Sequence, residues 1–307
     1  MNGRHGTVVI IGNFDGVHIG HAELVRRART AGGGGASRVV AMTFDPHPLA
    51  RIQPSAAPAR LTTFERRAAL LSECGVDEVI RLQPSAALLA LTPEEFIEHV
   101  VRDVHPVAIV EGQDFRFGKG RAGDVETLRQ LGTRHGFSVH IVPPVEAVMT
   151  DGMVAPASST LARWLLSHGR VKDAAAVLGR EYELDGIVVK GDQRGRQLGY
   201  PTANLGTECL LPADGVYAGW AVLPDGREVP AAISVGTKPM FGGVSRLLEA
   251  HLLGKPDVSR WSEYGWPIRV RVSRWLRDQM MFESVESLIR QIEADCRRAM
   301  PEGAVTA

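Results

Sequence analysis

The sequence predicts two domains, an α/β domain built on a parallel sheet and an antiparallel β-barrel that ends in a long helix. Over residues 8–142, short β-branched runs alternate with helical patterns, which is typical of a parallel sheet covered by helices. From residue 182 onward, β-type runs follow one another closely with glycine and proline turns between them, which is typical of a barrel. The change of pattern places the boundary near Glu181, so the expected domains span residues 1–181 and 182–307.

Length and composition agree with this division. At 307 residues the chain exceeds the usual size of one domain. Lysine plus arginine (35) balance aspartate plus glutamate (35), which argues against a protein that coats nucleic acid or an anionic membrane. No apolar run reaches bilayer length and no signal pattern opens the chain, so we expect a cytoplasmic monomer or weak homo-oligomer without a membrane partner. Three scattered cysteines provide neither a disulfide framework nor a Cys-rich metal site.

The elements of the first domain follow from local signals. Thr92, followed by a proline and by Glu95, forms a capping box that predicts a helix from residue 93. Thr62 and Glu65 repeat the box before a second helix. The glycine tract at residues 32–35 is expected to be a flexible connection. Strands are expected at residues 8–11, 39–44, 78–82, 107–110 and 139–142.

The stretch after the first strand, residues 12–21, carries the main signal of this domain. It reads G-N-F-D-G-V-H-I-G-H and leads into a helical pattern. Its glycines let the backbone pass close to a ligand, and the first N–H groups of a helix attract phosphate. His18 and His21, on one face of the first turn, can donate hydrogen bonds to oxygens that gain charge when an α-phosphorus is attacked. Alone, a glycine-rich turn is as consistent with a tight turn as with a phosphate site.

Three further segments place polar side chains where ligands bind in open α/β sheets. Residues 43–48, T-F-D-P-H-P, offer a carboxylate and an imidazole on an extended loop, and residues 111–120 combine aromatic rings with basic side chains such as Arg116. Residues 158–160, S-S-T, precede a helix containing Arg163, so hydroxyls, N–H groups and a guanidinium can close over phosphates. The alternatives are a rigid loop with a capping aspartate, a solvated β-turn and a simple N-cap.

The second domain is expected to hold its strands at residues 184–190, 216–222, 229–235, 247–253 and 268–272. Ser284 can cap the terminal helix. The apolar stripe of this helix, expected to be core rather than binding site, consists of Val285, Leu288, Ile289, Ile292, Cys296 and Ala299.

The loop at residues 191–204, G-D-Q-R-G-R-Q-L-G-Y-P-T-A-N, is the second candidate site. Its glycine spacing allows it to cover phosphates. Thr202 and Asn204 offer neutral oxygens on one side of an extended strand, which suits a magnesium ion shared with ATP phosphates. The Walker pattern G-x-x-x-x-G-K-[ST] is absent, so this is not a P-loop.

A candidate general base lies in the run at residues 246–253. Strand alternation sets Leu247, Glu249 and His251 on one face, while the other, expected core face carries Leu248, Ala250 and Leu252. On the pattern alone, a solvated strand glutamate is the favoured interpretation of Glu249, and His251 shares its face as a competitor for the role of base.

These motifs together resemble one family. H-x-G-H at a strand-to-helix junction resembles nucleotidyltransferases that release pyrophosphate, and the longer G-N-F-D-G-V-H-x-G-H resembles the prokaryotic bifunctional riboflavin kinase/FAD synthetase. T-F-D-P-H-P, G-x-D-F-R-F-G-K-G-R-A-G-D and S-S-T-x-x-R follow in the order of the family. The loop G-D-x-x-G-R-x-L-G-[FY]-P-T-A-N of riboflavin kinases is complete at every position. The sequence departs from the family at Leu161, Met240 and Ser262.

The resemblance implies a Rossmann-like FMN adenylyltransferase domain and a barrel-shaped riboflavin kinase domain. It implies ATP as co-substrate, Mg²⁺, and riboflavin, FMN and FAD as substrates and products. The catalytic residues it implies are His18, His21 and Glu249, and the metal ligands are Thr202 and Asn204. The nucleotide-binding residues are Gly12, Asn13, Phe14, Gly20, Ser158, Ser159, Thr160, Arg163, Gly191, Gly195, Arg196, Gly199 and Pro201. The flavin-binding residues are Asp45, His47, Asp114, Phe115 and Arg116.

Three other hypotheses compete with this interpretation. The first is an enzyme with one inactive domain, which the intact motifs in both domains disfavour. The second is a specialised paralogue that uses a modified flavin or another nucleoside triphosphate. Only the departures from the family at Leu161, Met240 and Ser262 support it. The third is a flavin-binding regulator or carrier that keeps the pockets without turnover. Formation of products from riboflavin, ATP and magnesium separates all of these.

Overall fold

The computed structural model of the protein describes residues 6–31, 37–191, 193–240 and 243–301, so the glycine tract at residues 32–35 lies outside it. The chain divides into two compact units. The first comprises Met1–Ala59, Phe64–Ala147 and Val154–Ser159, and the second comprises Arg60–Thr63, Val148–Met153 and Thr160–Ala307. The predicted boundary near Glu181 concerns the two activities and stays a prediction.

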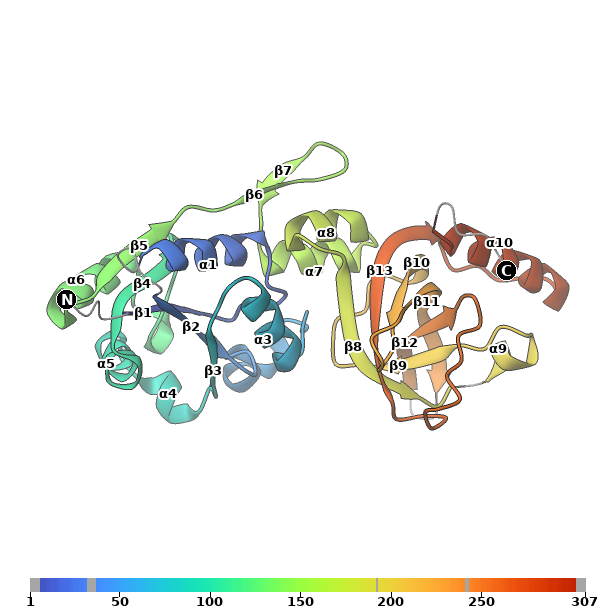
Figure 1. Ribbon diagram of the computed structural model, residues 1–307, viewed down its shortest axis with the longest axis horizontal. Helices are drawn as coiled ribbons and strands as arrows, with labels where there is room; N and C mark the ends of the chain where they lie inside the picture. Colours follow the sequence, from blue (N-terminus) through green and yellow to red (C-terminus); the bar gives the residue numbers. More distant parts are fainter. Residues whose placement is uncertain (1–5, 32–36, 192, 241–242, 302–307) are drawn as a thin grey trace. The chain divides into compact units, whose positions relative to one another are not determined.

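The first unit is built on a five-stranded parallel sheet, as expected, with the strand order β3-β2-β1-β4-β5 (Figure 1). The order reverses direction at β1, beside which β4 lies, and ligands bind at such a point in open α/β sheets. The strands are β1 (Thr7–Gly12), β2 (Arg38–Phe44), β3 (Glu78–Leu82), β4 (Pro106–Gly112) and β5 (Ser138–Val142).

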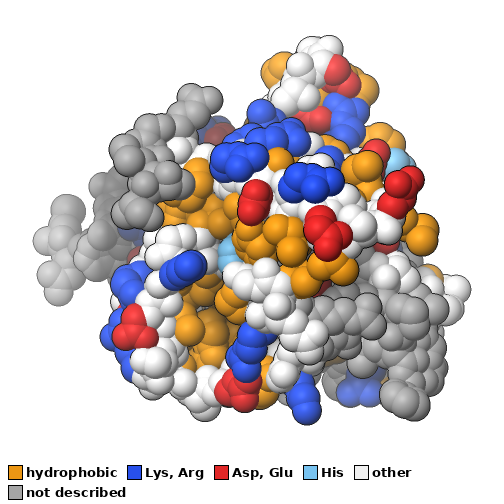
Figure 2. Space-filling view, turned by 90° about the vertical axis from the view of Figure 1, so that its right-hand side faces the viewer, with side chains coloured by type: hydrophobic (Ala, Val, Ile, Leu, Met, Phe, Trp, Pro, Cys, Tyr) orange, Lys and Arg blue, Asp and Glu red, His pale blue; other side chains and the backbone are white. Residues whose placement is uncertain are grey.

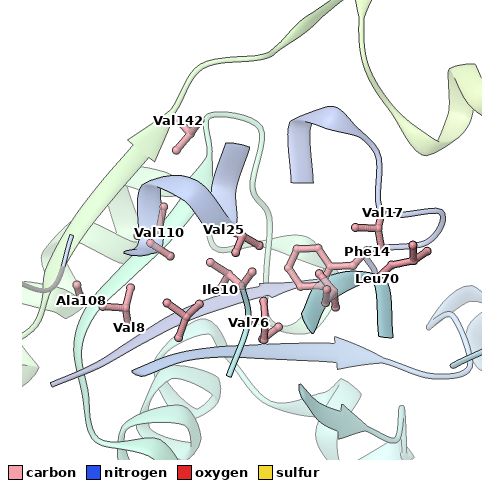
Figure 3. Packing of buried hydrophobic residues seen from close by; sticks show 14 residues of the cluster. Val8, Ile10, Phe14, Val17, Val25, Leu70, Val76, Ala108, Val110 and Val142 are labelled. Atoms are coloured by element: carbon pink, nitrogen blue, oxygen red, sulfur yellow. The ribbon is translucent and has the colours of Figure 1, made fainter. Parts of the chain in front are cut away.

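Side chains of the central strands alternate between two hydrophobic cores, because successive residues of a strand point to opposite faces. Val8 and Ile10 of β1 pack in one core with Val25 of helix α1 (Ile19–Ala31), as Figure 3 shows. Val9 and Ile11 pack in the other core, on the side of α5 (Pro93–Val104) and α6 (Val125–His135). The other helices are α2 (Leu49–Ile52), α3 (Phe64–Glu73), α4 (Ala86–Ala90) and the 3₁₀ turns η1 (Pro54–Ala56) and η2 (Lys119–Arg121).

Local signals fixed several helix ends. The capping box of Thr92 and Glu95 is present, with Thr92 Oγ1 accepting from Glu95 N at 3.2 Å. Helix α3 begins at Phe64, which makes Thr63, one residue after the predicted Thr62, the N-cap position. A hairpin of β6 (Glu146–Val148) and β7 (Val154–Pro156) was not expected from the sequence.

The second unit contains a closed barrel in which the strands follow the order β10-β11-β12-β9-β8-β13. These strands are β8 (Tyr182–Val189), β9 (Ala203–Gly206), β10 (Gly215–Val222), β11 (Glu228–Met240), β12 (Gly243–Leu252) and β13 (Pro267–Arg277). The sequence predicted five of them and missed β9, which is only 4 residues long and lies at the end of the candidate metal loop. Helices α7 (Ser159–Ser167), α8 (Val171–Leu178) and α9 (Arg194–Gln197) precede or interrupt the strands.

The terminal helix α10 (Val285–Ala299) begins at the predicted cap, since Ser284 Oγ accepts from Ser287 N at 3.1 Å. A buried ion pair holds it against the barrel, with Arg277 Nη2 of β13 lying 2.7 Å from Asp295 Oδ2. Figure 2, viewed from the side on which α9 and α10 lie in Figure 1, shows hydrophobic side chains gathered in a hollow with charged side chains around them. None of the helices in the described ranges has the length and apolar composition needed to cross a membrane.

Candidate active sites

The turn between β1 and α1 has an unusual backbone. Phe14 and Val17 adopt positive φ angles of 47° and 41°, as does Gly16 at 81°. A residue with a Cβ adopts a positive φ only at an energetic cost, and this cost is highest for β-branched residues such as valine. Phe14 and Val17 are 2% and 3% exposed and pack in the core against α1 (Figure 3). Tertiary packing therefore holds the strained turn in place below the start of the helix.

The two histidines of this turn stack on one another. Their ring centroids lie 3.6 Å apart with an interplanar angle of 25°. The backbone N–H of His18 donates to His21 Nδ1 at 3.3 Å, so in the neutral ring of His21 the proton resides on Nε2. A Cβ at position 20 would lie 3.0 Å from the His18 ring, which explains why Gly20 separates the pair. His21 thus carries an N–H donor at the N-terminus of α1.

The S-S-T segment reaches the same turn. Ser159 Oγ donates to the carbonyl of Asp15 at 2.7 Å. Helix α7 begins at Ser159, so Ser159 and Thr160 lie in its first turn, while Ser158 precedes it. Arg163 belongs to the same helix but to the second unit.

A cavity of about 410 Å³, here called the turn cavity, opens beside this turn. Gly12 and Asn13 line it, and Asn13 Nδ2 lies 3.2 Å from His47 Nε2. Phe115 also lines it and stacks on Phe117, with ring centroids 5.3 Å apart. The structure thus brings together predicted nucleotide-binding residues and four of the five predicted flavin-binding residues, namely His47, Asp114, Phe115 and Arg116.

Asp45, the fifth predicted flavin-binding residue, does not line this cavity. Its side chain is 1% exposed, and Arg67 and Arg81 pair with its two carboxylate oxygens. Arg67 also donates to the carbonyl of Phe44 at 2.9 Å. A buried carboxylate requires such partners. Asp45 therefore anchors the end of β2 in this structure, and the motif contributes His47 to the cavity.

In the second unit, a cavity of about 770 Å³ lies against the loop at residues 191–204 and is here called the loop cavity. Of the residues predicted to bind nucleotide or metal, Gly191, Arg196, Gly199, Pro201, Thr202 and Asn204 line it, whereas Gly195 lines a neighbouring cavity. Asn204 is 6% exposed, and its Oδ1 has no hydrogen-bond partner within the described residues. A buried oxygen of this kind needs a donor or a cation, so the donor set fits the magnesium ion that the family implies.

Residues of the segment 261–266, which no sequence motif assigned to a site, also line the loop cavity and contact the loop. Gln193 Nε2 donates to the Tyr264 hydroxyl at 2.8 Å, and Arg196 Nη1 pairs with Glu263 at 3.0 Å. Trp261 and Trp266 also line the cavity, stacked on each other with centroids 5.2 Å apart. In the sequence only the departure from the family at Ser262 marked this segment, because its residues are far from the loop in sequence.

A second cavity, of about 630 Å³, lies between the barrel and α10 and is here called the helix cavity. Leu288, Ile292 and Cys296 of α10 line it, although Cys296 also packs against a core cluster. The prediction that this stripe is core was wrong for Val285, which is 53% exposed. The helix leaves space there because its contact with the barrel is made by other residues, among them the Arg277–Asp295 pair and the buried Ala299. Burial raises the pKa of the Cys296 thiol to about 11, which keeps the thiol protonated.

The loop and helix cavities meet at three side chains, since Tyr200, Thr202 and His251 line both. Glu249 lines the helix cavity, and its strand register sets it directly opposite Asn204. Residues paired in this way project to the same side of a sheet. Leu248 and Ala250 are fully buried, as expected of the core face, whereas Leu252 is only half-buried and lines the loop cavity. The barrel therefore presents a carboxylate and an unpartnered amide oxygen side by side where two cavities join.

Comparison with known proteins finds a family model for each part of the chain. A family model of FAD synthetase matches residues 2–154, and one of riboflavin kinase matches residues 178–301. The bifunctional riboflavin kinase/FMN adenylyltransferase of Escherichia coli (strain K12) is 35% identical over 294 residues, covering 95% of this chain and 91% of that protein. The protein of the same name from Pseudomonas fluorescens is 35% identical over 300 residues, covering 96% and 93%.

The fold extends over the same length in a solved structure. A crystal structure described as a macrolide-efflux protein from Streptococcus pneumoniae superimposes with a TM-score of 0.84 at 32% identity, covering 97% of this chain and 95% of that chain. Two family models in succession, and relatives matched over nine-tenths of their length, lead to one conclusion: the chain belongs to the family of bifunctional riboflavin kinase/FMN adenylyltransferases.

Proposed function

We propose that this chain makes FAD from riboflavin in two steps. The barrel transfers the γ-phosphoryl group of ATP to the ribityl 5′-hydroxyl of riboflavin, and the α/β unit then joins FMN to AMP with release of pyrophosphate. The observation that carries the proposal is the junction of the loop and helix cavities, where Glu249 and the unpartnered Asn204 oxygen lie opposite one another. Such a junction suits transfer between two bound molecules.

For the kinase step we assign ATP to the loop cavity and riboflavin to the helix cavity. The apolar side chains of α10 suit the flavin ring, and the glycine-rich loop suits phosphates. Thr202 and Asn204 would hold magnesium, which neutralises charge on the phosphates. Glu249 accepts the proton of the 5′-hydroxyl while the oxygen of that hydroxyl bonds to the γ-phosphorus and the bond between the γ-phosphorus and ADP breaks.

For the adenylylation step the turn cavity would receive FMN beside the nucleotide. An oxygen of the FMN phosphate bonds to the α-phosphorus of ATP, and the bond between the α- and β-phosphates breaks. Charge develops on the α-phosphate oxygens, and His21 Nε2–H and His18 are placed at the start of α1 to stabilise it. No covalent enzyme intermediate is needed, because the residues act by positioning and by donating hydrogen bonds.

A product assay tests the proposal. The purified chain is incubated with riboflavin, ATP and magnesium, and flavins are separated by chromatography over time. We expect FMN to appear first and FAD to follow, and both to be lost when magnesium is chelated. Riboflavin that binds without conversion would identify a carrier. FAD formed only from supplied FMN would leave the barrel without kinase activity.

A further inference from the structure

We propose that His251 is a positioning residue that holds the metal loop of the kinase site through its Nδ1–H group. The proposal rests on the kinase function assigned above. His251 lies on β12 two residues after Glu249, on the same face, and its side chain lines both the loop cavity and the helix cavity. It therefore stands between the candidate base and the candidate metal ligands.

In the hydrogen bond between the His251 side chain and Pro201, only His251 can be the donor. His251 Nδ1 lies 2.7 Å from the carbonyl oxygen of Pro201. A carbonyl oxygen only accepts, so Nδ1 must carry a proton and donate it. In the neutral ring Nε2 then has a lone pair and no proton. The Tyr200 ring packs edge-on against the imidazole, with centroids 5.4 Å apart and an interplanar angle of 65°, and this contact restricts the ring further.

The hydrogen bond between His251 and Pro201 lies where the pairing of β12 with β9 ends. Strands β12 and β9 pair at Leu248 with Leu205, Glu249 with Asn204 and Ala250 with Ala203, and the pairing ends there. The next residues along the two strands would be His251 and Thr202. Pro201 has no N–H group, so the backbone ladder has no donor to offer at that residue. Beyond the last backbone pair, the imidazole of His251 supplies a hydrogen bond to the Pro201 carbonyl and so fixes the backbone just before Thr202.

We expect loss of this hydrogen bond to weaken magnesium binding rather than to slow proton transfer to Glu249. Thr202 is bonded to Pro201 and lies two residues before Asn204, so the Pro201 carbonyl sets the position of the first of two candidate ligands. Losing one neutral hydrogen bond should raise the magnesium concentration for half-maximal FMN formation by roughly three- to tenfold. The maximal rate at saturating magnesium and ATP should stay within about twofold of that of the wild type, because Glu249 is untouched.

Two isosteric replacements separate the two ring nitrogens. In His251→Asn the amide N–H₂ occupies the place of Nδ1, whereas in His251→Gln it reaches the place of Nε2. We expect His251→Asn to keep the magnesium dependence of the wild type, and His251→Gln and His251→Phe to show the rise. If His251→Gln kept it and His251→Asn did not, the functional atom would be Nε2 and the proposal would be wrong. A loss of the maximal rate in all three variants would make His251 the base instead.

A spectroscopic measurement checks the hydrogen bond without turnover. In ¹⁵N-histidine-labelled protein, long-range ¹H–¹⁵N correlations distinguish a protonated Nδ1 from a protonated Nε2, and the signal missing in His251→Asn assigns the residue. We expect protonation at Nδ1, and protonation at Nε2 would overturn the proposal. Wild-type protein that forms no FMN would refute the kinase assignment. Wild-type activity with an unaltered magnesium dependence in His251→Phe would refute only the role of His251.

Discussion

Replacing Gly191 by alanine disturbs the candidate metal site without removing any of its ligands. A Cβ at this position would lie 2.3 Å from Asn204 Nδ2 and 2.5 Å from Asn204 Oδ1. Ordinary van der Waals contact begins at 3.4 Å, so the carboxamide must move by about 1 Å. Asn204 is paired with Glu249 on one side and Val189 on the other, which leaves the side chain rather than the strand to give way.

The expected effect is large because displacement of a reacting or metal-binding group by about 1 Å costs roughly a hundredfold in rate. We expect FMN formation from riboflavin by Gly191→Ala to fall by about that factor at limiting magnesium, with partial recovery as magnesium is raised. Asn204→Ala should lose at least as much. The double variant should be no worse than Asn204→Ala alone, because the alanine at 191 acts only through Asn204.

The assay measures initial rates of FMN formation over a magnesium series, and FAD formation from supplied FMN serves as the internal control. Gly226→Ala is a control for a glycine-to-alanine change outside the site, since nothing lies within 4 Å of an added Cβ there. Gly226 has a positive φ of 84°, which Gly191 does not have, so this control also bears a backbone cost that Gly191→Ala does not. It carries the backbone cost of alanine in this conformation without touching the site. Wild-type phosphorylation by Gly191→Ala at low magnesium would show that Asn204 does not bind the metal.

Three further predictions concern other residues. His21→Ala should lower FAD formation from FMN roughly a hundredfold or more, because one preorganised donor to the α-phosphate is lost, while FMN formation persists; an equal loss of both activities in folded protein would contradict separate sites. Glu249→Gln should bind ATP and riboflavin as before yet phosphorylate at least roughly tenfold to a hundredfold more slowly in single turnovers at saturating magnesium, and a wild-type rate would move the base elsewhere. Glu111 accepts a hydrogen bond from Ile11 N, and burial raises the pKa of its carboxyl group. The contribution of Glu111 to the stability of the folded protein is therefore present below the pKa that this group has in the unfolded chain, and it is lost as pH rises through the pKa of the folded protein. Glu111→Gln should therefore raise the melting temperature at neutral and alkaline pH but not near pH 4, and an equal shift at every pH would refute this.

The sequence alone determined the features that depend on neighbouring residues. The parallel strands of the first unit, the capping box of α5, the N-cap of α10 and the burial of Leu248 and Ala250 in β12 all follow from side chains within a few positions of one another. The same holds for the turn with His18 and His21, whose spacing on one helical face already implies their contact. Family resemblance then named the chemistry, because the phosphate and metal motifs are contiguous in sequence.

Only the tertiary structure decided which of these side chains meet. Asp45 was expected at a ligand but is buried between Arg67 and Arg81, partners that lie 22 and 36 positions away in the chain. The stripe of α10 has the period of a core helix, yet Leu288 and Ile292 line a cavity, because the ion pair from β13 fixes where the helix rests. Periodicity gives the apolar face of an element but not what that face meets. The pairing of Asn204 with Glu249 likewise arises from the register of the closed barrel, a long-range property that no local pattern encodes.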